Sequence, residues 1–361
     1  MSVEKRVVAL GGEGIGIEVV DATCEILTGA GMPLEILTPP HGEPAIKSHG
    51  NPVPDETKQL CEGADGVLFG AAGAPPTSAV VQWLRWEKGI TASVRPVKHY
   101  PGAYSPLARP DGIDYVIVRE GVEGLYPGRE GTLADLARAM PELKDRVGRR
   151  VGDYGDGFFA VKVVSRAGTE RVARLACELA RKRKQRGKPG KLTCITKSNV
   201  LKQSDGFFRE VTESVVQGYP ELTYEHFHVD DGARRLVRFP QSMDVVLTMN
   251  LYGDILTDLA GETAGGLGMA PSGCFKEGWA YFESVHGSAP DIAGRGIANP
   301  TGCILSAVMM LEHMGLAAEA DGLEGAVARV YRDGKTLTAD QGGKASTREF
   351  ARAVLDAYRT R

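Results

Sequence analysis

Features typical of zinc, disulfide-rich, nucleic-acid-binding or membrane proteins are scarce in this sequence of 361 residues. Its six cysteines form no CxxC pair and no cluster with histidine, which argues against zinc, iron–sulfur and disulfide frameworks. The net charge is only −3, so no global field attracts nucleic acid or an anionic membrane. The most apolar late run, 303–311, is too short to cross a bilayer, and the first residues do not resemble a signal peptide. These absences favour a protein of the reducing cytoplasm.

The sequence instead contains strand patterns that alternate with helix patterns. An apolar strand at 6–10 runs through glycines into a helical pattern at 18–27, and further strand candidates are 66–69, 115–118, 192–196 and 244–249. This alternation predicts an α/β protein with much parallel sheet, and the length allows roughly two domains. The first glycine turn does not have the G-x-G-x-x-G spacing, so a standard Rossmann domain is rejected.

Three aspartates are candidates for a metal site. Asp254 and Asp258 follow an apolar strand and lie one turn apart on the same face of a predicted helix. Two carboxylates at this spacing repel unless a cation lies between them, and ligand sets of oxygen alone favour Mg²⁺ or Mn²⁺ over zinc. Asp230, 24 residues before Asp254, would complete such a site. From the residues alone, a helix cap and a surface acid explain Asp254 and Asp258 equally well.

Arginines form the second group of candidates. Arg119 ends the predicted strand 115–118, at the strand end where α/β proteins usually bind ligands, and Arg85 and Arg95 precede it. Planar guanidinium groups suit bidentate binding of carboxylates. Taken singly, Arg85 is better explained as a surface charge, but three arginines with three aspartates indicate a dianionic substrate beside a cation.

Two further segments have opposite interpretations. The loop that begins at His286 is rich in glycine and small polar residues that suit a nucleotide. Its Asp291 would accept hydrogen bonds from a ribose diol and repel a 2′-phosphate. The basic run 181–191 contains seven Lys or Arg but no interleaved aromatic residue, and it ends a predicted helix, where cations favour the dipole. It therefore indicates a helix terminus rather than a nucleic-acid site.

These segments, in this order, resemble the isopropylmalate/isocitrate dehydrogenase family of β-decarboxylating dehydrogenases, which includes tartrate/D-malate and homoisocitrate dehydrogenases. The most specific blocks are 250–258, 286–300, and Val118-Arg119-Glu120 leading to Tyr126. The interval from Asp230 to Asp254 and the seven-residue step from Arg119 to Tyr126 also match. The resemblance runs from residue 10 to residue 316, so it covers most of the chain.

The resemblance implies roles for individual residues. It makes Arg85, Arg95 and Arg119 clamps for the malate carboxylates, and Tyr126 and Lys197 the acid/base pair. It also makes Asp254 and Asp258 ligands of Mg²⁺ or Mn²⁺. Asp230 would come from a partner subunit, and Lys197 would cross the same interface, so a homodimer with shared active sites is expected. The expected cofactor is NAD, held by His286, Gly287, Ser288, Ala289, Asp291, Ile292 and Asn299.

The resemblance also implies the architecture. The fold would be that of isopropylmalate dehydrogenase, with two α/β domains and a mixed sheet, and not a standard Rossmann fold. A discontinuous NAD-binding domain would combine residues 1–98 with 265–361. Residues 99–264 would form the substrate and dimerisation domain, including an arm.

Departures from the family pattern bear on the substrate. Gly89 and Ser93 stand where the family usually has an acid and an asparagine, which keeps open a homologue that binds a nucleotide or carboxylate without turnover. Ser78 and Gln82 lie on the face expected to meet the substituent on C3 of the substrate. A buried amide at Gln82 disfavours an isopropyl group, because its hydrogen bonds would be unmet. The prediction is therefore a D-malate- or tartrate-like substrate, with isopropylmalate, isocitrate and homoisocitrate as alternatives.

Overall fold

The computed structural model describes residues 4–360 and is built around one sheet of ten strands in the order β2-β1-β3-β12-β11-β4-β5-β10-β8-β9, with a separate two-stranded ribbon of β6 and β7. The strands are β1 (Lys5–Gly12), β2 (Leu34–Leu37), β3 (Gly66–Ala71), β4 (Ala92–Lys98), β5 (Asp114–Glu120), β6 (Glu130–Thr132), β7 (Phe158–Ala160), β8 (Lys191–Thr196), β9 (Thr223–His228), β10 (Val245–Thr248), β11 (Pro271–Lys276) and β12 (Trp279–Ser284).

Twelve α-helices in this part of the chain connect and cover the strands. They are α1 (Ile15–Gly29), α2 (Gly42–His49), α3 (Asp55–Gly63), α4 (Ala79–Gln82), α5 (Leu133–Ala139), α6 (Arg166–Gln185), α7 (Ser204–Val216), α8 (Val229–Arg238), α9 (Asn250–Ala264), α10 (Thr301–His313), α11 (Ala317–Asp333) and α12 (Thr347–Arg359). Helix α4 continues directly into a π-helical turn, Trp83–Glu87. Within residues 4–360, no helix is both long and apolar enough to cross a membrane.

The sheet is parallel towards both edges and antiparallel at its centre. β1 pairs in parallel with β2 and β3, and β3 pairs in parallel with β12. β5, β10, β8 and β9 form a second parallel block. Between the blocks, β4 is antiparallel to both β11 and β5. The predicted α/β fold with a mixed sheet, distinct from the standard Rossmann arrangement, is confirmed.

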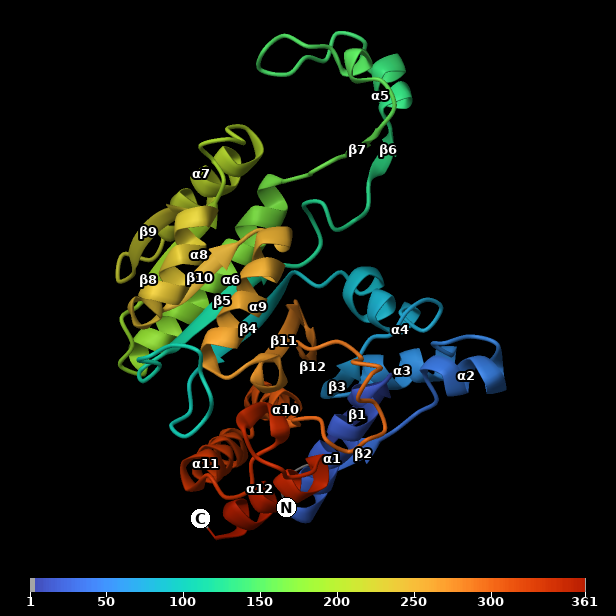
Figure 1. Cartoon of the computed structure of the whole chain (residues 1–361), viewed down its shortest axis with the longest axis vertical. Coiled ribbons are helices and arrows are strands. Elements are labelled where there is room, and N and C mark those ends of the chain that lie inside the picture. Colours follow the sequence, from blue (N-terminus) through green and yellow to red (C-terminus); the bar gives the residue numbers. More distant parts are fainter. Residues whose placement is uncertain (1–3, 361) are drawn as a thin grey trace.

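Alternate residues of the strands supply the hydrophobic core on the two faces of the sheet. In β10, Val245 and Leu247 pack with α6 and α7, whereas Val246 packs with α8 and α9. Each such side chain contributes about 1.5–3 kcal/mol when fully buried. At the other end of the sheet, α1, α10, α11 and α12 pack together over one face of β1, β3 and β12. The first and last helices thus lie side by side, as Figure 1 shows.

An arm projects from the body of the molecule (Figure 1) and consists of β6, α5, a 3₁₀ turn at Val151–Tyr154 and β7. Its exposed apolar side chains are Met140, Leu143, Val147, Tyr154, Phe158 and Val161. Exposed apolar groups on such a thin element typically mark a contact surface. The division into domains at 98 and 265 stays a prediction, because the single sheet runs through both parts.

Candidate active site

The two candidate metal-binding acids lie near the start of a helix that follows a parallel strand. Asp254 and Asp258 lie in the first turns of α9, which directly follows β10. β10 pairs with β5 so that Thr248 lies opposite Arg119. The carboxyl end of β5 therefore brings Arg119 to the start of α9, as the position of this arginine at its strand end predicts.

Arg119 is a buried guanidinium group, with its side chain 3% exposed. It donates from Nε and Nη2 to the Asn250 side-chain oxygen at 3.1 and 2.8 Å, and from Nη1 to Asp254. A buried charge of this kind is tolerated only when it is paired and hydrogen-bonded. Asn250 and Asp254 supply both conditions from one turn of α9.

Arg95 reaches the same acids from β4, the neighbour of β5. Its guanidinium is buried, donates to Thr257 Oγ1 at 2.5 Å, and lies 3.7 Å from Asp254 and 4.0 Å from Asp258. The antiparallel pairing of β4 with β5 places Arg95 and Arg119 on the same face of the sheet. Two guanidinium groups thus face two carboxylates across the start of α9.

Tyr126 completes this cluster. Its hydroxyl donates to the second oxygen of Asp254, and its ring lies 4.6 Å from the guanidinium carbon of Arg119. The indole of Trp86 stacks on the Tyr126 ring, with centroids 6.4 Å apart and planes inclined by 25°. The sequence did not predict a role for Trp86, although Trp86 directly follows Arg85 in the chain.

Arg85 contributes to the cluster but has an acidic partner of its own. It donates from Nη2 to Glu283 at 2.7 Å and from Nε to the Tyr281 hydroxyl at 3.4 Å. Glu283 is almost fully buried near the end of β12, three residues before His286. The sequence does not identify Glu283, because its role depends on a strand pairing that brings it beneath the turn Trp83–Glu87.

The pKa values of the two acids of α9 shift in opposite directions. Burial would raise the pKa of Asp254, but the Arg119 guanidinium and the Tyr126 hydroxyl outweigh it and hold the pKa below its ordinary value. Burial raises the pKa of Asp258, and the more distant Arg95 offsets this only in part. Burial and the hydrogen bond to Asp254 raise the pKa of Tyr126, so its phenol is protonated at neutral pH.

Lys197 and Asp230 form a separate pair. Lys197 follows β8, Asp230 lies at the start of α8, and the ammonium group donates to the carboxylate. Among residues 4–360, no three His, Cys, Asp or Glu side chains of this chain gather as a metal site. Asp254 and Asp258 thus have no third protein acid beside them within one chain, and the expectation that Asp230 comes from a partner stays a prediction.

The predicted cofactor loop follows β12 and lies against the first glycine turn. The Ile15 amide donates to the Ser288 carbonyl at 2.9 Å, and a Cβ at Gly14, where φ is +56°, would collide with that carbonyl. Beside this contact, His286 Nε2 and Glu18 Oε1 are buried without a hydrogen-bond partner. Such atoms are rare in folded proteins and are available to a polar ligand.

The remaining predicted cofactor residues divide into two kinds. Asp291 and Gly287 are exposed, and Ala289 and Ile292 are half-buried. Asn299 instead has structural partners, because its amide nitrogen donates to Asp340 and Tyr331 while its oxygen accepts from the amide of Thr301. A direct cofactor contact through the Asn299 side chain would compete with these bonds.

Gln82 and Ser78, the residues expected to meet the substituent on C3, differ in exposure. The Gln82 side chain is exposed, and Ser78 is half-buried one helical turn earlier. Because bound substrate would bury the Gln82 amide, its unfavourable effect on an apolar substituent stays a prediction.

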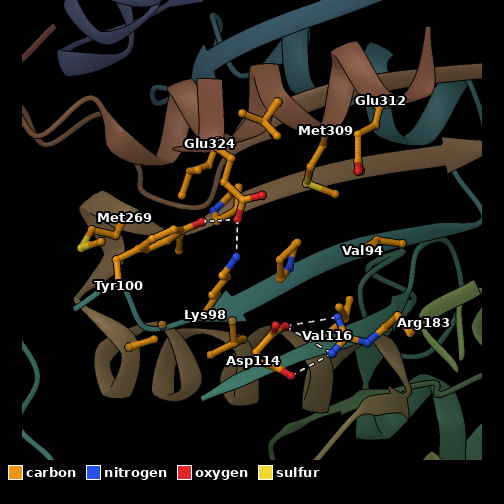
Figure 2. Close-up of a pocket in the computed structure, with 18 of the residues that line it drawn as sticks. Val94, Lys98, Tyr100, Asp114, Val116, Arg183, Met269, Met309, Glu312 and Glu324 are labelled. Atoms are coloured by element: carbon orange, nitrogen blue, oxygen red, sulfur yellow. Dashed lines mark hydrogen bonds and ion pairs between the residues drawn. The ribbon is translucent and has the colours of Figure 1, made fainter. Parts of the chain in front are cut away.

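One cavity lies on the opposite face of the central strands and not at this cluster. It measures about 270 Å³ and is bounded by β4, β5, α6, α10 and α11 (Figure 2). Side chains alternate along β4, so Val94 and Lys98 face this cavity whereas Arg95 faces α9. The charged residues at its edge are paired with each other, as Lys98 is with Glu324 and Arg183 with Asp114.

The cluster as a whole combines groups suited to a small anion and to proton transfer. Two buried arginines and a third close by face two carboxylates and a protonated phenol, which can act as a proton donor. The Isocitrate/isopropylmalate dehydrogenase family model matches residues 6–354. The chain therefore belongs to the isocitrate/isopropylmalate dehydrogenase family, and the predicted enzyme class, a β-decarboxylating dehydrogenase, is confirmed by this membership.

Individual relatives are similar over almost their full length. The chain is 42% identical to the 3-isopropylmalate/3-methylmalate dehydrogenase of Methanocaldococcus jannaschii, over 98% of this chain and 99% of that protein. It is 38% identical to the isocitrate/homoisocitrate dehydrogenase of Thermus thermophilus, with the same coverage. The crystal structure of isocitrate dehydrogenase from Methylococcus capsulatus superimposes with a TM-score of 0.85 at 32% identity, covering 98% of this chain and 99% of that one.

The opposite pKa shifts of Asp254 and Asp258 predict how binding of a divalent ion depends on pH. A metal ion binds the ionised carboxylate, so a proton on Asp258 competes with it. Because the pKa of Asp258 is raised, Mn²⁺ affinity will weaken on acidification at a higher pH than an ordinary aspartate would cause. Asp258→Asn will weaken Mn²⁺ binding at pH 7.5 and flatten this pH dependence, as measured by the electron paramagnetic resonance signal of free Mn²⁺.

The control is Asp321→Asn, which changes an exposed acid of α11. It will leave both the affinity and its pH dependence as in the wild type. If Asp258→Asn binds Mn²⁺ as tightly as Asp321→Asn does, Asp258 is not a metal ligand.

Proposed function

We propose that this enzyme oxidises and decarboxylates a 3-alkylmalate, such as 3-isopropylmalate, with NAD and a divalent metal ion. The observation that carries the proposal is the gathering of Arg85, Arg95, Arg119 and Tyr126 around Asp254 and Asp258. The names of the relatives, among them 3-isopropylmalate/3-methylmalate dehydrogenase, favour this alternative over the D-malate or tartrate substrate predicted from the sequence.

Charge balance supports a dianion bound together with a divalent cation. The three arginines are matched within one chain by Glu283, Asp254 and Asp258, so the cluster is close to neutral on its own. A dianion alone would leave an excess of negative charge in a partly buried site, and a divalent ion alone would leave an excess of positive charge. The two together keep the site neutral, which limits the free energy of desolvation.

The donor set suits Mg²⁺ or Mn²⁺. Asp254 and Asp258 offer only oxygen, and within residues 4–360 no His or Cys gathers with them as a metal-binding group. They would hold the ion together with Asp230 of a second copy of the chain. A bound ion supplies Lewis acidity that acidifies the substrate 2-hydroxyl and polarises the developing carbonyl. Without the ion, both oxygens of Asp254 are occupied by Arg119 and Tyr126.

Two groups of the protein handle protons in the proposed reaction. Lys197 of a second copy, as the neutral amine, would take the proton of the 2-hydroxyl, and bound NAD would supply the hydride acceptor for C2. Loss of carbon dioxide from the resulting β-keto acid leaves an enolate, and Tyr126 delivers a proton to its C3. The raised pKa of Tyr126 keeps this proton available at neutral pH. Arg95 and Arg119 orient the two carboxylates until one of them leaves as carbon dioxide.

The cofactor would bind between the first glycine turn and the loop after β12. The bare backbone at Gly14 and the unpartnered atoms of His286 and Glu18 suit a polar ligand that approaches closely. Asp291 is exposed on this loop, where its charge would repel a 2′-phosphate and accept from a ribose diol. These features support NAD over NADP.

A substrate panel tests the proposal. The wild-type enzyme with Mn²⁺ and NAD⁺ will reduce NAD⁺ fastest with 3-isopropylmalate or another 3-alkylmalate, and more slowly with D-malate, tartrate, isocitrate and homoisocitrate. Formation of NADH is followed at 340 nm. Repeating the best substrate with NADP⁺ will give a much lower kcat/KM. A homologue that binds without turnover would give no NADH with any acid, and a preference for NADP⁺ would contradict the role of Asp291.

Mixed dimers test whether two copies share each site. Tyr126→Phe and Lys197→Met will each abolish or strongly reduce turnover as homodimers. A dimer with one subunit of each kind contains one intact site, made of Tyr126 from one copy and Lys197 from the other. Random mixing therefore restores about a quarter of wild-type activity if the sites are shared across a two-fold axis. Differently tagged subunits and tandem purification isolate the mixed dimer.

The control is the same mixture prepared without subunit exchange. It will show only the residual activity of the two parents. If purified mixed dimers are no more active than the parents, Tyr126 and Lys197 act within one chain, and the proposed interface is wrong.

A further inference from the structure

We infer that Trp86 is a specificity-determining residue, and that its indole forms the apolar wall against the substituent on C3 of the substrate. This inference rests on the proposed function and adds a substrate contact to it. It is carried by the position of Trp86 on its helix and by its stacking on Tyr126.

The helix places Trp86 next to the substrate clamps. Gln82 lies one turn after Ser78, and its backbone N–H donates to the Ser78 carbonyl at 3.0 Å. The π-helical turn that follows contains both Arg85 and Trp86. Arg85 points to Glu283 and the arginine cluster, while Trp86 packs against Tyr126. The same turn thus provides a cation for a carboxylate and an apolar surface beside it.

The stacking on Tyr126 locates that surface relative to the reacting carbon. Tyr126 is the group that delivers a proton to C3, so its hydroxyl must lie close to C3 in the complex. The indole is parallel to the Tyr126 ring within 25°, at a centroid distance of 6.4 Å. A group attached to C3 and directed away from the charged residues therefore meets the indole.

The composition of the site decides which substituent fits there. The other side chains of the cluster are arginines, aspartates and the Tyr126 phenol, so Trp86 supplies its apolar area. Ser78 and Gln82 continue the helix without a positive charge, so nothing on this face pairs with a third carboxylate. An isopropyl or methyl group gains free energy by covering the indole, whereas a hydrogen, hydroxyl or carboxylate gains less.

The other two tryptophans have structural partners that Trp86 does not share. Trp83 is buried and packs edge-to-face with Trp279, at 6.4 Å and 74°. Trp279 also donates from its indole nitrogen to the Cys61 carbonyl. Trp86 is half-buried, and its ring partner is the proposed proton donor.

The test is the ratio of kcat/KM for 3-isopropylmalate to that for D-malate. Trp86→Gln will lower this ratio by about tenfold or more, because a missing apolar contact of this size changes discrimination by 10- to 200-fold. Trp86→Phe will restore part of the ratio. A purely structural role would lower both values of kcat/KM together and leave the ratio unchanged, which would overturn the inference. Trp279→Phe, the matched loss of a half-buried indole, will leave the ratio as in the wild type.

Tryptophan fluorescence provides a readout that does not depend on turnover. Adding 3-isopropylmalate with Mn²⁺ will change the emission of the wild type and of Trp279→Phe, and this change will be absent in Trp86→Phe. If the wild type shows turnover but the emission change persists in Trp86→Phe, the inference fails and the proposed function stands. If the wild type shows neither turnover nor an emission change with any 3-alkylmalate, both fail.

Discussion

Two buried guanidinium groups face two carboxylates at the start of α9, and the rest of the site depends on this contact. Arg95 and Arg119 are buried to about 95% or more, so they require acidic partners to avoid a large desolvation free energy. Asp254 and Asp258 meet this requirement, with Asn250 and Thr257 as neutral acceptors. The same pairing presents carboxylates to a divalent ion and guanidinium groups to a dianion.

The mixed sheet explains how the contact is built. β4 and β5 are adjacent and antiparallel, so one arginine comes from each strand onto one face, while apolar residues of the same strands face α6 and α10. β10 lies beside β5 and delivers α9 to the end where Arg119 emerges. An all-parallel sheet would require long crossover connections between these strands. The central antiparallel strands thus bring residues 85, 95, 119, 254 and 283 together.

Patterns that depend on local sequence were predicted well. The strands β1, β3, β5, β8 and β10 were visible because buried parallel strands form continuous apolar runs. The spacing of Asp254 and Asp258 and the strand-end position of Arg119 marked candidates that the structure brings together. β4 and β11 were missed because Arg95, Pro96 and Pro271 break the apolar pattern. Glu283, Trp86 and the exposure of Gln82 depend on packing between distant segments, which neither spacing nor residue type reveals.

The most direct measurement of the central claim is the anomalous diffraction signal of Mn²⁺ in crystals grown with a 3-alkylmalate. The account predicts a strong peak between Asp254 and Asp258, with Asp230 of a second copy as a further ligand and substrate carboxylates on Arg95 and Arg119. Asp254 would then have exchanged one of its present partners for the ion. A saturated crystal with no peak at these acids, and with Asp254 still bound to Arg119 and Tyr126, would contradict the account.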